Sequence, residues 1–137
     1  MARLMAIDYG KKRTGLAVTD PLQMIATGLT TVATHDLIPF LKKYLVTEPV
    51  ETIIIGEPKN LDGNATDATA LVTECIRIIK KNFPEIPVVT VDERFTSKMA
   101  FQAMIDSGLK KKDRRNKALV DEISATIILQ EYLRNKI

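Results

Sequence analysis

The sequence contains few of the residues that disulfides and most zinc sites require. Its 137 residues include one cysteine, Cys75, and one histidine, His35. These counts exclude an internal disulfide, a cysteine-cluster zinc site and a His-rich metal site. No apolar run approaches the roughly 20 residues of a membrane-spanning helix, and the first residues lack the apolar stretch and cleavage site of a signal peptide. We therefore expect a cytoplasmic protein without a membrane partner.

The sequence also lacks internal repeats, low-complexity tracts and linkers. Its length is that of one domain, which commonly has about 100–200 residues. Hydrophobic residues make up 45% of the chain and charged residues 27%, close to the averages of soluble globular proteins. A chain of this length can bury a core without disulfides or a structural metal. We therefore predict a single domain over residues 1–137.

Positive charge is concentrated in one segment of the chain. The formal net charge is +3, but residues 98–117 contain seven lysines and arginines and only two aspartates, so the rest of the chain is net negative. A smaller basic cluster, Lys11, Lys12 and Arg13, lies near the start. This distribution predicts an anionic partner such as nucleic acid, although an ordinary solvated surface would have the same composition.

The hydrophobic pattern predicts five strands and four helices. Short apolar runs bounded by turn residues indicate strands, and apolar residues spaced three and four apart indicate helices. Apolar strands joined by helices pair in parallel, and an opening hairpin adds an antiparallel part. We therefore predict a three-layer α/β fold in which a mixed five-stranded sheet carries helices on both faces. The expected strands are residues 3–8, 15–19, 28–33, 52–56 and 88–91, and the expected helices are residues 36–46, 66–82, 97–107 and 117–133.

Three acidic residues lie where such a fold places its ligands. Asp8 ends the first strand and Glu93 follows the 88–91 strand. Asp121 lies on a face of the last helix whose other residues are small or apolar. Ligands of open α/β sheets bind at strand ends, and three carboxylates gathered there would repel one another unless cations bound between them. Mg²⁺ or Mn²⁺ suits such an all-oxygen site and would support hydrolysis of a phosphodiester bond. Taken singly, each acid could instead serve an ordinary turn, a local salt bridge or a surface ion pair.

Several motifs together resemble the YqgF family, which is also described as a family of Holliday-junction resolvases or pre-16S ribosomal RNA nucleases. The resemblance covers nearly the whole chain, in order, and the motifs are specific as a set although none is specific alone. They are MAIDYG at 5–10, RTGLA at 13–17, IIGEP at 54–58 with DG at 62–63, VDERFTS at 91–97, and Lys117 with VDEISA at 120–125.

The resemblance implies a ribonuclease H-like fold related to the RuvC-type resolvases. It also implies metal-dependent cleavage of nucleic acid with Mg²⁺ or Mn²⁺, and trimming of the end of precursor 16S ribosomal RNA. By the family's motifs, Asp8, Glu93 and Asp121 are the expected catalytic and metal-binding acids. The residues expected to contact nucleic acid are Lys12, Arg13, Thr14, Arg94, Thr96, Ser97 and Lys117.

Two acids near these motifs leave alternatives open. Glu57 stands where the family has an apolar residue, and it is either a fourth acid of the site or a tolerated loop substitution. Asp92 precedes Glu93, and because strand residues alternate in direction only one of them can face the metals.

Three other functions compete with an RNA nuclease. The chain could be a Holliday-junction DNA resolvase, acting as a monomer or homodimer, or an inactive module that binds nucleic acid or the ribosome. An actin-like or sugar-kinase-like ATPase also opens with Asp-x-Gly and a phosphate-holding hairpin, but such enzymes clasp nucleotide between two domains.

Overall fold

The predicted mixed five-stranded sheet is present in the computed structural model, which describes residues 2–57, 68–92 and 117–135. The strand order is β3-β2-β1-β4-β5. The β1–β2 and β2–β3 pairs are antiparallel, whereas β1–β4 and β4–β5 are parallel. The elements are β1 (Arg3–Tyr9), β2 (Arg13–Thr19), β3 (Ala26–Ala33), the 3-10 helix η1 (Thr34–Asp36), α1 (Leu37–Thr47), β4 (Val50–Glu57), α2 (Ala68–Asn82), β5 (Val88–Asp92) and α5 (Lys117–Asn135).

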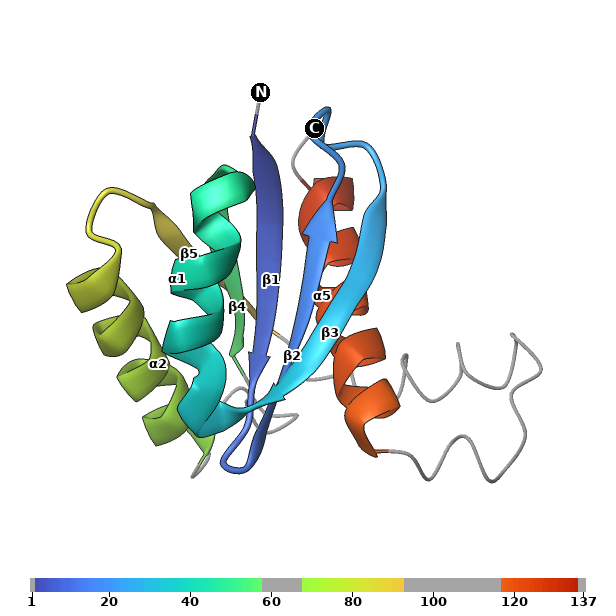
Figure 1. Ribbon diagram of the computed structural model, residues 1–137. Helices are drawn as coiled ribbons and strands as arrows, with labels where there is room; N and C mark the ends of the chain where they lie inside the picture. The colour runs from blue at the N-terminus through green and yellow to red at the C-terminus, as the bar shows by residue number, and fades with distance from the viewer. Residues whose placement is uncertain (1, 58–67, 93–116, 136–137) are drawn as a thin grey trace.

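Helices cover both faces of the sheet, so the predicted three-layer architecture is confirmed (Figure 1). Helices α1 and α2 pack on one face through a cluster that includes Met5 and Ile7 of β1. Helix α5 packs on the other face through a cluster that includes Leu4 and Ala6. Successive strand residues point to opposite faces, so Asp8 lies on the α5 face and Tyr9 on the face of α1 and α2.

Two element boundaries differ from those expected. The second strand was expected to begin at Gly15, but β2 begins at Arg13, and Thr14 pairs with Tyr9 in the antiparallel ladder. The next helix was expected to begin at residue 36, but Asp36 ends the 3-10 helix η1 and α1 begins at Leu37. Asp36 is the N-cap residue of α1, and its side chain makes no capping hydrogen bond among the described residues. The hairpin is therefore tighter than expected, and a 3-10 turn leads into the helix.

No helix among the described residues is long and apolar enough to cross a membrane. The expected helix at 97–107 lies outside the described residues.

Candidate active site

Asp8 and Asp121 come close together because α5 packs on β2. Gly15 of β2 lies directly opposite Asp8 in the β1–β2 ladder. A Cβ atom on Gly15 would lie 2.1 Å from the carbonyl oxygen of Asp121, so only glycine leaves room for the α5 backbone here. The missing side chain thus lets Asp121 approach the end of β1.

The first turns of α5 are held against β3 as well as β2. The hydroxyl of Thr31 on β3 donates a hydrogen bond of 2.6 Å to the carbonyl oxygen of Ala118. Gly28 of the same strand faces the side chain of Glu122, whose Oε1 would lie 2.4 Å from a Cβ at that glycine. Figure 1 shows that α5 begins at the end of the sheet where β1 finishes. The hydrogen bond from Thr31 therefore fixes the start of α5 on β3, whereas the contact at Gly28 involves a flexible side chain.

The electrostatics of Asp8 indicate a site with an excess of negative charge. Burial raises the pKa of Asp8 from 3.8 to about 6, and the nearby charge of Asp121 acts on this pKa in the same direction. A buried carboxylate loses hydration, and a like charge beside it disfavours ionisation. Together the two effects leave a strand end that would be stabilised by a bound cation.

Arg13 forms an ion pair with Asp121. Its Nε donates to Oδ2 of Asp121 at 2.8 Å, and the two side chains are 39% and 22% exposed. Ion pairs of this exposure contribute little to stability, typically about 0–1 kcal/mol. The pair is better understood as positioning the Asp121 carboxylate beside the hairpin that carries Asp8.

Glu57 lies on the other side of the sheet from this pair. It ends β4 on the same strand face as Ile53 and Ile55, which pack in the cluster under α1 and α2. Strand alternation therefore places Glu57 on the face opposite to that of Asp8. This favours the second alternative, in which Glu57 is a tolerated substitution and not a fourth acid of the site. Asp92 pairs with Glu57 in the β4–β5 ladder, and its side chain lies outside the described part of the chain.

The structure corrects the expected role of Thr14. This residue was expected to contact phosphate, but its side chain is fully buried and its hydroxyl lies 3.0 Å from that of Thr34. A buried, bonded hydroxyl has no access to a polyanion, so Thr14 serves the fold of the hairpin. Lys12, by contrast, is exposed in the turn between β1 and β2.

The remaining predicted site residues fall outside the part of the chain that the structure describes. They are the expected third acid, Glu93, together with Arg94, Thr96, Ser97 and the side chain of Lys117. Within residues 2–57, 68–92 and 117–135, no group of three acids, histidines or cysteines is arranged to hold a metal.

Sequence reasoning missed two residues that build the site. Gly15 was part of a motif, but its role in the approach of α5 was not anticipated; a glycine inside a strand is the signal for such a close contact. Thr34 was also missed, and its hydrogen bonds to the β1–β2 turn depend on a long-range contact that no local pattern reveals.

The sheet order, the helices on both faces and the acids at the end of β1 define a ribonuclease H-like α/β protein. The RuvC structure from T. thermophilus in complex with Holliday junction substrate superposes with a TM-score of 0.57 at 16% identity, covering 98% of this chain and 96% of that one. A second Thermus thermophilus RuvC structure gives a TM-score of 0.56 at 16% identity, covering 96% and 95%. Likeness at this identity concerns the fold.

Sequence comparison then identifies the family. Residues 2–135 match the family model of RuvX, described as Holliday junction resolvase, and the chain belongs to this family. A relative from Flavobacterium psychrophilum is 58% identical over 137 residues, all of both chains. A relative from Phocaeicola vulgatus is 60% identical over 136 residues, which are 99% of this chain and 98% of its own. Both carry the name "Putative pre-16S rRNA nuclease". The resemblance drawn from the motifs is thus confirmed.

Proposed function

We propose that this chain is a metal-dependent nuclease that hydrolyses phosphodiester bonds near an end of precursor 16S ribosomal RNA in the cytoplasm. In this proposal, residues 1–137 form one nuclease domain. The observation that carries it is the convergence of Asp8 and Asp121 at Gly15. Family membership and the name of the full-length relatives support the reaction and the substrate.

The residues at the end of β1 fit a divalent cation. Carboxylate oxygens are the ligands that Mg²⁺ and Mn²⁺ prefer, and Asp8 lies in a buried environment made more negative by Asp121. We propose Asp8, Asp121 and Glu93 as the residues that hold the metal. When bound, Mg²⁺ or Mn²⁺ supplies a Lewis acid and activates water for attack on phosphorus.

The protein's own residues would orient the substrate at this site. Arg13 holds the Asp121 carboxylate in place and, at the mouth of the site, is positioned to exchange this contact for a phosphate oxygen. Guanidinium groups suit phosphate because they offer several donors in a fixed plane. Lys12, in the neighbouring turn, adds a positive charge for the backbone of the substrate. Further phosphate contacts are proposed for Arg94, Thr96, Ser97 and Lys117.

The test is a cleavage panel with the purified chain. Precursor 16S RNA and a four-way DNA junction are each incubated with Mn²⁺, with Mg²⁺, and with a chelator. We expect metal-dependent cleavage of the RNA and a loss of at least about a hundredfold, the scale of one lost transition-state interaction, in Asp8→Asn, Asp121→Asn and Glu93→Gln. Glu85→Gln is the matched control, because Glu85 is an exposed acid before β5, at the opposite end of the sheet.

The outcomes separate the proposal from its rivals. Undiminished cleavage by Asp8→Asn would refute the assigned site. Binding of RNA without cleavage under every metal condition would show an inactive binding module. Preferred cleavage of the four-way junction would make the chain a DNA resolvase, the activity in the description of its family, and two symmetric cuts would then call for two copies acting together.

A further inference from the structure

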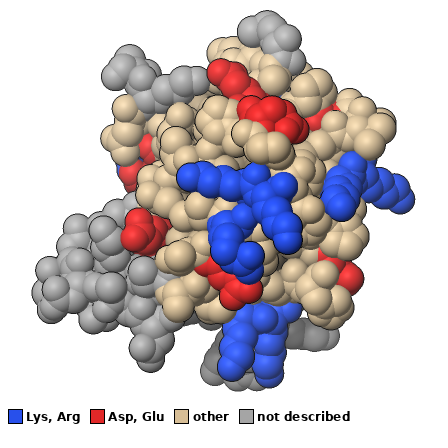
Figure 2. Space-filling model, turned by 90° about the vertical axis from the view of Figure 1, so that its left-hand side faces the viewer, with Lys and Arg blue, Asp and Glu red and all other residues tan. Residues whose placement is uncertain are grey.

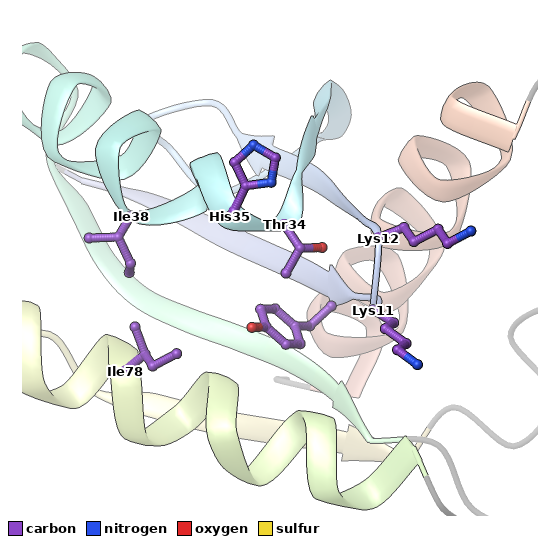
Figure 3. A pocket seen from close by; sticks show the side chains of 7 residues that line it. Lys11, Lys12, Thr34, His35, Ile38 and Ile78 are labelled. Carbon is purple, nitrogen blue, oxygen red and sulfur yellow. The ribbon is translucent and has the colours of Figure 1, made fainter.

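A cavity lies behind the candidate active site, on the other face of the sheet. It has a volume of about 650 Å³, within the range of roughly 300–1,000 Å³ of small-molecule sites. It opens between α1 and α2 beside the β1–β2 turn, and Figure 3 shows Ile38 and Ile78 facing each other across it. It is lined by Tyr9, Lys11, Lys12, Thr34, His35, Ile38 and Ile78.

The cavity combines an aromatic ring, apolar walls and a cationic rim. Tyr9 packs against the core on the face of α1 and α2 and lines the cavity. Ile38 and Ile78 supply apolar contact. Lys11 and Lys12 are exposed in the turn, and Figure 3 shows their side chains extending from it at the end of the cavity away from Ile38 and Ile78. This is the combination by which proteins stack a base and hold its phosphate.

The basic rim is held in place by the fold. The Thr34 amide donates to the carbonyl oxygen of Lys12 at 3.0 Å, and the Thr34 hydroxyl donates to the carbonyl oxygen of Gly10 at 2.7 Å. Since that hydroxyl has one proton, the Thr14 hydroxyl donates to Thr34 in their 3.0 Å contact. The lysine-bearing turn is thus fastened to the chain segment that leads into α1, so ordering it on binding costs little entropy.

Positive charge continues along the side of the molecule where α2 lies. Arg77, Lys80 and Lys81 are exposed on α2, and Figure 2 shows lysine and arginine side chains gathered near the centre of that side. Acidic groups are also present: Glu74 contacts Arg77 at 3.5 Å, and Asp36 lies 3.6 Å from His35. Glu57 ends β4 on the same face as Tyr9 and adds a third acid. Lys11, Lys12, Arg77, Lys80 and Lys81 still outnumber these three acids, which favours a polyanion there.

We infer that this cavity binds one nucleotide of the single-stranded substrate, at a position other than the scissile bond. That the strand is RNA rests on the proposed function. Asp8 and Tyr9 are consecutive residues on opposite faces of β1, so a strand that leaves the acidic site passes over the β1–β2 turn and reaches the cavity. Its base stacks on Tyr9 between Ile38 and Ile78, and its phosphate contacts Lys11 and Lys12.

The protein contains one histidine, His35, so its imidazole resonance reports directly on the cavity. The experiment follows this signal by NMR in the full chain, with a chelator present so that no metal-dependent cut occurs. The probes are a single-stranded RNA oligonucleotide, adenosine monophosphate and inorganic phosphate. We expect the oligonucleotide to shift the His35 resonance saturably at lower concentration than the mononucleotide, with no shift from phosphate alone.

Variants assign the shift to the cavity. Loss of the ring in Tyr9→Leu should weaken oligonucleotide binding about tenfold, within the range for one base–aromatic stack, whereas Tyr9→Phe should stay within twofold. Lys11→Ala should weaken binding several-fold and flatten its salt dependence, because one phosphate contact is lost. Lys42→Ala removes another exposed lysine, on α1 and outside this cavity, and should have no effect.

The inference would be overturned if the oligonucleotide did not shift the His35 signal, or if inorganic phosphate shifted it equally. It would also be overturned if the mononucleotide bound as tightly as the oligonucleotide, because the ligand would then be a free nucleotide. Failure of the nuclease proposal would be seen separately, as a saturable shift without cleavage in the metal panel.

Discussion

Replacing Gly15 by alanine should force α5 away from the sheet at the candidate active site. The new Cβ would lie 2.1 Å from the carbonyl oxygen of Asp121 and 2.4 Å from its carbonyl carbon, so the helix must retreat by roughly 1 Å to restore van der Waals contact. Overpacking of this kind costs about 1–3 kcal/mol, and removal of a strand glycine offsets about 0.5–1 kcal/mol of it. We therefore expect a net loss of up to about 2.5 kcal/mol.

The same shift should impair the reaction more than the fold. A displacement of about 1 Å in a reacting group can cost about a hundredfold in rate, and Asp121 moves with the backbone that Gly15 contacts. Urea denaturation measures the loss of stability, and metal-dependent RNA cleavage measures the loss of rate. Both should be seen in one variant.

Gly28→Ala is the matched control on the neighbouring strand. Its Cβ would meet the side chain of Glu122, with Oε1 at 2.4 Å and Cγ at 2.8 Å, and a flexible side chain can rotate away where a helix backbone cannot. We expect stability within about 0.5 kcal/mol, as for an ordinary surface change, and cleavage within twofold of the wild type. Equal effects of the two substitutions, or full activity in Gly15→Ala, would refute the reasoning.

Three further predictions concern the acids and their partners. Asp8→Asn should raise the free energy of unfolding at pH 8 by about 1–3 kcal/mol and leave it unchanged near pH 3, where the carboxyl is protonated in both the folded and the unfolded state. The reason is that the folded state, with the pKa of Asp8 at about 6, loses stability as pH rises through that value; urea denaturation giving equal differences at both pH values would contradict this. Arg13→Gln should cost at most about 1 kcal/mol of stability, since the ion pair of Arg13 with Asp121 is partly exposed. The same variant should lower the rate of RNA cleavage at least tenfold, and an unchanged rate would exclude a role for Arg13 in the reaction. Glu57→Gln should cleave within twofold of the wild type, because Glu57 lies on the other face of the sheet, and a large loss in the same assay would place it in the site after all.

The elements of this fold could be predicted because their signals are local. The apolar run of β4 indicates a strand covered on both faces, and the short polar segment after Asp8 indicates a hairpin. Periodic apolar residues on α1 and α2 indicate helices that cover a sheet. Strand ends are where α/β sheets bind ligands, so the pattern of residues around Asp8 was enough to identify it as a candidate.

The tertiary structure decided which of these residues act together. The contact between Gly15 and the Asp121 backbone, the ion pair between Arg13 and Asp121, and the hydrogen bond of Thr14 with Thr34 join residues that are far apart in the chain. The face on which Glu57 lies follows from the register of β4 with its neighbours. Strand and helix propensities act over a few residues, whereas these contacts depend on how one element packs on another. The sequence therefore determined the elements and the candidate acids, and the packing of α5 on β2 determined the site.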